Sequence, residues 1–282
     1  MKKTSLGGYS GCKILLIEEE SGCGGFVRKI SSSKDYNIRL IEQKEKQKVF
    51  SSEIVRVPSV LDDGYTEDGL YYFDMEYIRG IALSERIKNV EVGKIRNYVN
   101  SIFDLSLSMK NVQNEQNATY AFEKKISNLR DSLPYGKDEY ITRCIDKLTR
   151  HNWDMYNGTF CHGDLTFENI IVKNDELYLI DFLDSFYDCW LLDIATLLQD
   201  AECMWAYRRD GFVENNTKIR LMIFKNTLVD RLRDYDERFV DEVEYGLLLK
   251  LLRIIPYVND SNTASFLNAN IKRIYHNLEG VE

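Results

Sequence analysis

The chain has 282 residues, 44% of them hydrophobic, which is enough for one large domain or for two lobes with substantial cores. Its 37 Lys and Arg against 45 Asp and Glu give a net charge of -8, which argues against nucleic-acid binding and against a polybasic membrane-binding surface. Because the N-terminus lacks the unbroken apolar stretch of a signal peptide and the six cysteines form no C-x-x-C pair, we expect a cytoplasmic protein with reduced thiols.

The N-terminal part of the chain has β-strand character and one helix. Residues 12–17 and 26–30 are β-rich runs separated by a glycine-rich turn at 21–25, which predicts a hairpin. A helix is expected over residues 35–50, where Ile38, Ile41, Glu45 and Val49 are spaced to share one face. Residues 53–60 and 70–77 return to strand character. These patterns predict a small antiparallel lobe that carries one helix.

After Gly80 the apolar residues recur with the 3.6-residue period of helices. Helical segments are expected around Ile95 and Ile141 and over residues 191–198, 218–232 and 243–255, with an exposed, Asn- and Gln-rich loop at 111–119. Residues 170–172 and 177–182 are short apolar runs joined by a polar turn at 173–176, which predicts a second hairpin. We therefore expect an α+β fold with two lobes, residues 1–79 and 80–282, divided near residues 78–82.

Acidic and amide side chains lie in and before this second hairpin, in the stretch CHGDLTFENIIVKNDELYLIDFLDS. Pairing of the hairpin would put Asn169 and Asp181 at neighbouring strand ends, with Asp164 in the preceding loop. An unpaired buried carboxylate is costly, so such a cluster usually handles a cation or a proton. Asn and Asp oxygens suit Mg²⁺, and a third carboxylate can accept a hydrogen bond from an incoming hydroxyl. This layout is typical of phosphoryl transfer.

These residues resemble the motifs of a known family. His162-Gly163-Asp164 with Asn169, and Ile180-Asp181-Phe182, are similar to the H-G-D-x-x-x-x-N and I-D-F motifs of the aminoglycoside phosphotransferase and choline kinase-like small-molecule kinases. That family shares the protein-kinase fold, with a small antiparallel β N-lobe and a larger, mainly helical C-lobe. The resemblance therefore implies the same two-lobe architecture that the strand and helix patterns predict separately.

The resemblance also implies roles for these residues and two cofactors, ATP and Mg²⁺. Asp164 would be the catalytic base, Asn169 and Asp181 would hold Mg²⁺, and His162 would brace the loop. Asp193, twelve residues beyond Asp181, fits the acidic residue that usually follows the metal-binding aspartate, and we expect it to brace the catalytic loop. The alternative for Asp193 is an ordinary carboxylate near a helix N-terminus.

The N-terminal lobe matches the family less strongly. Lys29 ends a β-strand where the fold keeps its phosphate-binding lysine, and Glu45 is expected to face inward as its ion-pair partner, with Glu42 as the competing choice. A solvated lysine and an ordinary helix glutamate are the alternatives. At the lobe boundary, the Glu76 carbonyl and the Ile78 amide would bind adenine, unless this segment is only an edge strand that enters a linker.

The glycine-rich segment GGYSG at residues 7–11 allows two interpretations. Its backbone N–H groups could cover the phosphates of the nucleotide, or it could form a plain hairpin turn. Protein-kinase features are missing elsewhere, because Gly163 stands where an Arg would precede the aspartate, Leu183 follows Phe182 in place of Gly, and no A-P-E motif is present. We therefore do not expect a protein substrate.

The function expected from the sequence is ATP- and Mg²⁺-dependent transfer of the γ-phosphate to a hydroxyl of a small molecule, such as a sugar or an amino alcohol. The alternatives are an aminoglycoside antibiotic phosphotransferase, whose cationic acceptor the acidic composition would suit, and an inactive kinase-fold binding module. The motifs leave ATP versus GTP and the oligomeric state open. Because the acceptor must reach Asp164 from the side opposite ATP, its pocket is expected in the helical region, with Arg253, Pro256 and Tyr257 as candidates. The alternative for this segment is a structural helix end, where the Arg extends to solvent and the Tyr packs.

Overall fold

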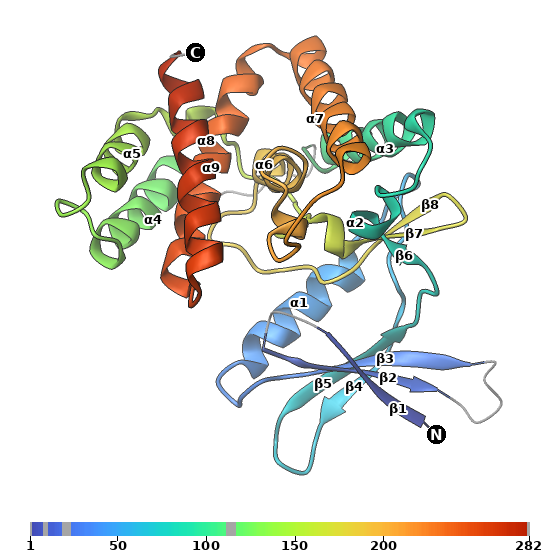
Figure 1. The fold of residues 1–282 in the computed structure, drawn as a ribbon. Helices are drawn as coiled ribbons and strands as arrows, with labels where there is room; N and C mark the ends of the chain where they lie inside the picture. Colours follow the sequence, from blue (N-terminus) through green and yellow to red (C-terminus); the bar gives the residue numbers. More distant parts are fainter. Residues whose placement is uncertain (1, 8–10, 19–23, 111–116, 281–282) are drawn as a thin grey trace. The chain divides into compact units, whose positions relative to one another are not determined.

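The structure is a computed structural model that describes residues 2–7, 11–18, 24–110 and 117–280. It divides into two compact units, and Figure 1 shows their elements. The first unit consists of Met1–Ala82 and Asn169–Asp184, and the second unit consists of Leu83–Glu168 and Ser185–Glu282. The sequence prediction assigned all of residues 80–282 to one lobe. In the structure the second hairpin belongs to the first unit, where its first strand pairs with residues 81–82.

A five-stranded antiparallel sheet forms most of the first unit. Its strands are β1 (Lys2–Leu6), β2 (Lys13–Glu18), β3 (Gly25–Ile30), β4 (Val60–Tyr65) and β5 (Tyr71–Glu76), in the order β1-β2-β3-β5-β4. The pairing of β2 with β3 confirms the first predicted hairpin, although residues 19–23 of its turn lie outside the described residues. The strand predicted over residues 53–60 is wrong, because β4 begins at Val60 and only Arg56 forms a bridge before it. Strand β1 was not predicted.

Helix α1 (Asn37–Val49) packs on β4 and β5 with a face that differs from the predicted one. Ile38 and Val49 are 69% and 68% exposed, whereas the buried residues of the helix are Leu40, Gln43, Lys44 and Gln47. Only Leu40 among them joins the apolar core of the sheet, which also contains Cys12, Leu16, Val27, Tyr71, Phe73 and Met75. The helix therefore presents polar side chains to the interior of the unit.

A three-stranded sheet completes the first unit, with the order β6 (Ile81–Ala82), β7 (Ile170–Lys173) and β8 (Glu176–Leu179). The pairing of β7 with β8 confirms the second predicted hairpin, and its two turn residues, Asn174 and Asp175, have φ of 51° and 65°. Asn and Asp tolerate this left-handed conformation, which two-residue hairpin turns require. At Gly80 a Cβ would lie 2.5 Å from Ile171 Cγ2, so only glycine lets the chain pass this close to β7.

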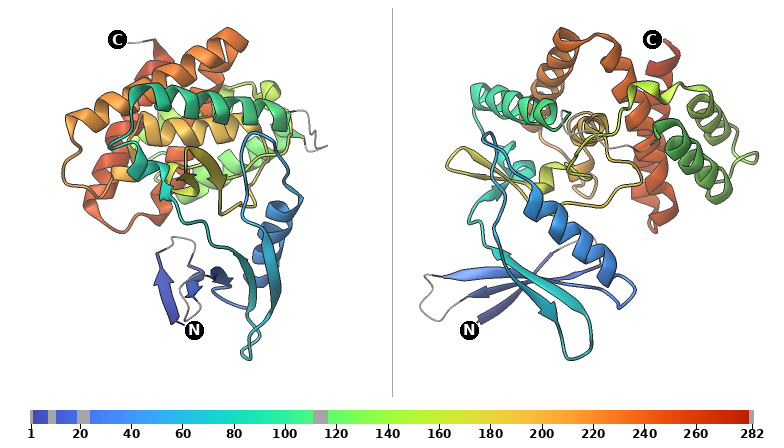
Figure 2. Two further views of the ribbon diagram at one scale, coloured as in Figure 1. Left: turned by 90° about the vertical axis from the view of Figure 1, so that its right-hand side faces the viewer. Right: turned by 180° about the vertical axis from the view of Figure 1, so that it is seen from behind.

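The second unit is helical. Its α-helices are α2 (Leu83–Arg86), α3 (Val92–Lys110), α4 (Ala118–Ser132), α5 (Glu139–Arg150), α6 (Trp190–Ala201), α7 (Asn215–Tyr235), α8 (Arg238–Ile254) and α9 (Ser261–Glu279). Single turns of 3-10 helix occur at Trp153–Met155, Phe167–Asn169, Trp205–Tyr207 and Ile255–Tyr257. Every residue of α6 is buried, because α3, α7 and α8 all pack against this helix (Figure 2). A helix enclosed in this way can fix buried polar groups in place.

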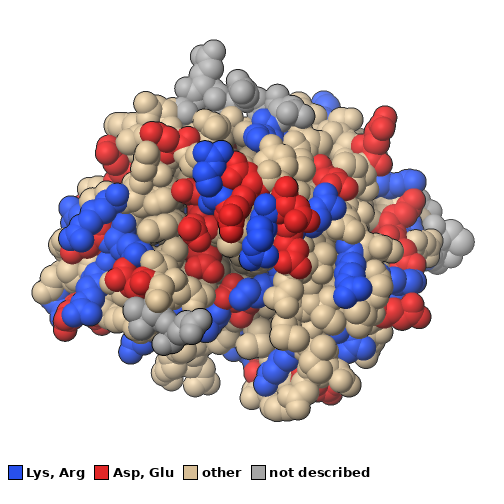
Figure 3. All heavy atoms as spheres, turned by 90° about the horizontal axis from the view of Figure 1, so that it is seen from above, with Lys and Arg blue, Asp and Glu red and all other residues tan. Residues whose placement is uncertain are grey.

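The surface carries both signs of charge. On the face drawn in Figure 3, the coloured Lys and Arg side chains are interspersed with Asp and Glu side chains. That face therefore does not present, among the described residues, the one-sign basic footprint that nucleic-acid binding requires. None of the described helices is long and apolar enough to cross a membrane. Most of the predicted loop at residues 111–119 lies outside the described residues.

Candidate functional site

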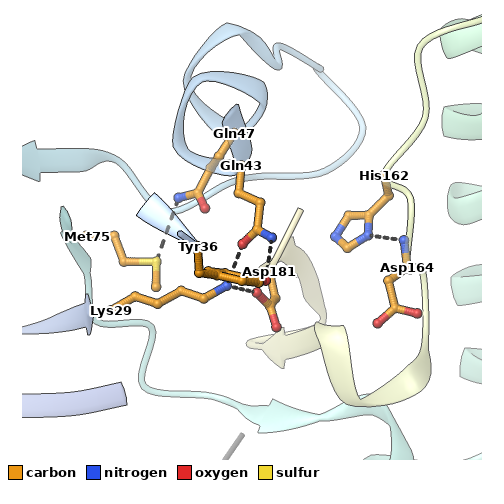
Figure 4. Close-up of polar contacts among 8 residues, drawn as sticks. All are labelled: Lys29, Tyr36, Gln43, Gln47, Met75, His162, Asp164 and Asp181. Atoms are coloured by element: carbon orange, nitrogen blue, oxygen red, sulfur yellow. Dashed lines mark hydrogen bonds and ion pairs between the residues drawn. The ribbon is translucent and has the colours of Figure 1, made fainter. Parts of the chain in front are cut away.

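A buried lysine is the central charged group of the first unit. Lys29 lies on β3 and is 2% exposed, and its Nζ donates a hydrogen bond of 3.0 Å to Gln43 Oε1. The same ammonium forms an ion pair with the Asp181 carboxylate (Figure 4). Gln43 Nε2 in turn donates to the Tyr36 hydroxyl at 3.1 Å, which fixes the amide with its oxygen toward the lysine. Lys29 is therefore held between one neutral acceptor and one carboxylate.

The prediction that Glu45 or Glu42 faces inward to pair with Lys29 is wrong. The Glu45 side chain is 51% exposed and pairs with Lys44 at 2.6 Å, and Glu42 is also exposed. Residues two apart on a helix differ by roughly 200° in direction, so a helix that turns Gln43 inward turns Glu45 to solvent. The prediction failed because it placed the buried face by the apolar residues Ile38 and Val49, which are exposed in this helix.

Asp181 follows β8 in a backbone conformation that is uncommon for a side-chain-bearing residue. Its φ is 64°, in the left-handed region, which costs roughly 1 kcal/mol for most residues and is visited more readily by Asp. Contacts around it hold this conformation in place. The Phe182 ring lies 5.1 Å from that of Phe50, and Lys46 Nζ donates to the Leu183 carbonyl at 2.9 Å. Strained residues of this kind cluster at functional sites, because surrounding structure must stabilise them.

The ends of the second hairpin bring two oxygen donors to adjacent backbone positions. Ile180 N donates to the Asn169 carbonyl at 3.0 Å, so the residue before Asp181 is bonded directly to Asn169. One carboxylate and one side-chain amide oxygen form the hard and open donor set that suits Mg²⁺, which keeps several ligand positions for water and phosphate. No group of three or more His, Cys, Asp or Glu residues gathers as a closed metal cage in the described part of the chain. These residues fit a magnesium ion.

In the second unit, the predicted catalytic aspartate lies in a tight loop. Asp164 N donates to His162 Nδ1 at 3.3 Å (Figure 4), and the Asp164 carbonyl accepts from Thr166 N at 2.8 Å. Gly163 has a φ of 91°, a conformation that favours glycine, so the H-G-D sequence matches the turn that it makes. His162 is fully buried. The loop backbone is thus constrained on both sides of Asp164.

Asp193 fixes the start of this loop from the first turn of α6. Its carboxylate is fully buried and accepts hydrogen bonds from the backbone N–H of His162 at 2.5 Å and of Gly163 at 3.0 Å. The prediction that Asp193 braces the loop before Asp164 agrees with these contacts, and the catalytic role of the loop stays a prediction. Charge-assisted hydrogen bonds of this kind are among the strongest in proteins, and here they join two consecutive peptide groups to the most buried helix of the unit.

A second buried acid of α6 was missed by the sequence analysis. Asp200 is fully buried and accepts from Phe167 N at 2.6 Å and from Ala206 N at 2.9 Å. Burial raises the pKa of its carboxyl from 3.8 to about 7, against the effect of these two hydrogen bonds. The available signal was its spacing, because Asp200 lies two helical turns beyond Asp193 and so on the same face of α6. The two acids together hold residues 162–167.

The other predicted site residues lie in less distinctive surroundings. Glu76 ends β5 and donates from its backbone N to Ser59 at 2.9 Å, and Ile78 is 8% exposed. Tyr257 is 80% exposed, whereas Arg253 stacks its guanidinium over the Phe186 ring at 4.9 Å. Residues 8–10 of the predicted phosphate loop lie outside the described residues.

Comparison with known proteins supports one family and one fold. The sequence profile of the phosphotransferase enzyme family matches residues 6–217. The structure is similar to an amicoumacin kinase in complex with AMP-PNP, Ca²⁺ and Ami, with 16% identity and a TM-score of 0.67 over 96% of this chain and 87% of that chain. It is also similar to a thermostable mutant of an aminoglycoside phosphotransferase in ternary complex with ADP and hygromycin B, with 12% identity and a TM-score of 0.63 over 97% and 94% of the two chains.

A third similar structure is the ethanolamine kinase of Plasmodium vivax, with 14% identity and a TM-score of 0.54 over 97% of this chain and 81% of that chain. No curated protein matches the chain significantly. At these identities the solved structures show the fold alone, and they confirm the predicted α+β, protein-kinase-like fold.

Proposed function

The chain belongs to the phosphotransferase enzyme family, and on that premise we propose that it transfers the γ-phosphate of ATP, with Mg²⁺, to a hydroxyl of a small molecule. The observation that carries this proposal is the buried Lys29, oriented by a neutral amide and paired with Asp181 beside Asn169. Related folds were solved with AMP-PNP and Ca²⁺ or with ADP, which supports the use of a nucleotide and a divalent cation.

We assign the nucleotide to groups of the first unit. Lys29 binds phosphate oxygens, because a buried ammonium gains most from a partner of high negative charge. Gln43 keeps that ammonium in position without adding a charge of its own. The backbone groups of Glu76 and Ile78 bind the adenine. Lys29 and Asp181 form an ion pair with each other in the structure. When the magnesium nucleotide binds, Lys29 would bind phosphate instead and Asp181 would bind the metal.

Asn169 and Asp181 are the proposed magnesium ligands. When bound there, Mg²⁺ would supply positive charge that neutralises the phosphate groups of the nucleotide. The role of the chain is to hold these two oxygen donors at fixed positions, through the backbone bond between Ile180 and Asn169 and through the packing of Phe182.

Asp164 is the proposed catalytic base. Its carboxylate accepts a hydrogen bond from the acceptor hydroxyl and takes the proton as the new P–O bond forms and the bond from the γ-phosphorus to the bridging oxygen of ADP breaks. Because this reaction needs positioning more than covalent help, the loop should be rigid. Asp193 and Asp200 provide that rigidity by accepting backbone hydrogen bonds from the loop. The cytoplasmic location expected from the composition stays a prediction.

Two measurements on the purified protein test this function. Calorimetric titration with ATP, with and without Mg²⁺, should show binding that the metal strengthens. A screen of hydroxyl-bearing metabolites, read out as ADP formation and confirmed by mass spectrometry of the product, should then identify an acceptor. Absence of magnesium-dependent nucleotide binding in a folded sample would contradict the proposal, and Asp164→Asn protein is the control for turnover by contaminants.

A further inference from the structure

Two basic side chains of the second unit lie over one aromatic ring, and one of them acts electrostatically on a third. Lys125 Nζ on α4 and Arg253 Cζ on α8 lie 5.9 Å and 4.9 Å from the centroid of the Phe186 ring. Lys250 lies one helical turn before Arg253 on α8. We call Lys125, Lys250 and Arg253 the cationic cluster. Its members come from helices far apart in sequence, so the fold and not the local sequence brings them together.

Both lysines of the cluster have pKa values below the ordinary value of a lysine. Lys250 is only 9% exposed, and burial lowers the pKa of its ammonium, an effect to which Arg253 adds. Burial and Arg253 also lower the pKa of Lys125. Neither lysine forms an ion pair or a hydrogen bond with any residue that the structure describes. Since the Phe186 ring carries no net charge, it does not neutralise the ammonium group of Lys125 that lies over it.

Lys250 links the cationic cluster electrostatically to the loop that contains Asp164. The carboxylates of Asp164 and Asp193 raise the pKa of Lys250, in opposition to burial, so their charges act on its ammonium. Asp188 connects the two segments, because its Oδ1 accepts from Cys161 Sγ at 3.3 Å and from Ser185 Oγ at 3.2 Å. Cys161 begins the catalytic loop, and Ser185 precedes Phe186.

We infer that the acceptor is an anion: a small molecule that carries a carboxylate or phosphate group in addition to the hydroxyl that Asp164 accepts. This inference rests on the proposed function. The cationic cluster binds the anionic group, and the half-buried Phe186 ring packs against the carbon skeleton. An acceptor with several ammonium groups would be repelled by the positive charges of the cluster, which would weaken its binding. The acidic composition suggested the opposite acceptor because a net charge averages over the whole surface.

Acceptor series that differ only in charge test the inference. The first series compares glycerate and glycerol 3-phosphate with glycerol and 3-amino-1,2-propanediol, and the second compares glucuronate with glucose and glucosamine. Hygromycin B serves as a polycationic acceptor. We expect kcat/KM for at least one anion to exceed that of its neutral and amino counterparts by about tenfold or more, the effect of one charge-assisted hydrogen bond. The two anions of the first series distinguish a carboxylate from a phosphate.

Variants of the cationic cluster identify the residues responsible. Lys125→Met should raise the KM of the anionic acceptor about tenfold and leave the KM of ATP unchanged, whereas Lys125→Arg should restore binding. Lys124→Met is the matched control, because Lys124 is the exposed neighbour on the same helix. Lys250→Met should act in the same direction. If Lys250→Met does not fold, Lys125→Met still decides the result, since Lys125 is only half-buried.

The outcomes separate this inference from the proposed function. Turnover of glycerol, glucose or an amine that equals or exceeds turnover of the matched anion keeps the phosphotransferase activity and overturns the inference. If no acceptor of either series is turned over, calorimetry with glycerol 3-phosphate and glucuronate decides. The inference is overturned if neither anion binds, or if Lys125→Met does not weaken the binding. Loss of magnesium-dependent ATP binding would instead contradict the proposed function.

Discussion

The two units hold their functional groups by different chemistry. In the first unit, Lys29 is oriented by the neutral amide of Gln43 and by a single carboxylate, that of Asp181. In the second unit, the loop that contains Asp164 is held by Asp193 and Asp200, buried carboxylates that each accept two backbone N–H groups. These hydrogen bonds tie the loop backbone to α6 at three positions, so the loop is fixed. The lysine can exchange Asp181 for phosphate while Gln43 keeps it in place.

Removal of a carboxylate that holds the loop should have the largest effect on both stability and activity. Asp193→Ala leaves two buried N–H donors without an acceptor, each at a cost of about 1–3 kcal/mol. We expect a loss of several kcal/mol in the free energy of unfolding and a fall in kcat of about 100-fold, because the loop shifts. Urea unfolding and steady-state kinetics measure both. Asp230→Ala, at an exposed ion pair with Arg233, should change little, and an equally mild Asp193→Ala would refute the role of this brace.

Loss of the buried lysine should affect catalysis more than stability. Lys29→Ala removes a phosphate contact present in both the ground state and the transition state, so we expect a higher KM for ATP and a lower kcat, each by roughly tenfold or more. Lys13→Ala on the neighbouring strand β2 is the control, since Lys13 is exposed. Kinetics of Lys29→Ala that match those of Lys13→Ala would remove Lys29 from the phosphate site.

The amide of Gln43 should matter less than the lysine that it orients. Gln43→Leu removes one hydrogen bond to Lys29 and one to Tyr36, and we expect the KM for ATP to rise about fivefold, equivalent to about 1 kcal/mol. Glu45→Ala and Glu42→Ala should leave this KM unchanged, because both side chains are exposed. A larger effect of either glutamate than of Gln43 would show that the lysine has a different partner during turnover.

The last expected effect concerns stability alone, as a change in its pH dependence. The pKa of Asp200 is raised by burial from 3.8 to about 7 in the folded chain, so the folded state binds an extra proton between these pH values. Raising the pH through this window therefore lowers stability. Asp200→Asn keeps an oxygen acceptor but cannot ionise. Its Tm should therefore fall less than the Tm of the wild type between about pH 5 and pH 7, which lies within the range of that pKa shift. Parallel Tm curves for the two proteins would contradict the raised pKa.

The parts that the sequence could predict have a local physical cause. The second hairpin is one of them, because its apolar runs flank Asn174 and Asp175, which accept the positive φ of a tight turn. The strand expected over residues 53–60 is the contrary case, because Ile54 and Val55 look β-like while Pro58 has no N–H to donate. Arg56 pairs there with a strand far away in sequence, through backbone hydrogen bonds of 2.9 Å to Leu177 and from Leu179. Because the partner strand is distant in sequence, residues 53–60 contain no local pattern that could have predicted this pairing.

The candidate site was predictable where residues recur at motif spacing and not where the fold assembles it. Asp164, Asn169 and Asp181 stand in one short stretch, so spacing alone proposed their chemistry. Gln43 has no charge to attract notice, and the orientation of α1 decides whether it or Glu45 meets the lysine. Lys125 and Arg253 meet at the Phe186 ring only through the packing of the helical unit, and no local sequence pattern predicts that contact.

The most direct test of the account is the split between nucleotide binding and turnover in Asp164→Asn, with Asp181→Ala as its counterpart. Asp164 is assigned to the acceptor and Asp181 to the magnesium nucleotide. Asp164→Asn should therefore abolish phosphotransfer and keep its ATP affinity within a few-fold of wild type, whereas Asp181→Ala should lose the magnesium-dependent part of that affinity. Wild-type turnover by Asp164→Asn, or an unchanged effect of Mg²⁺ on ATP binding in Asp181→Ala, would contradict it.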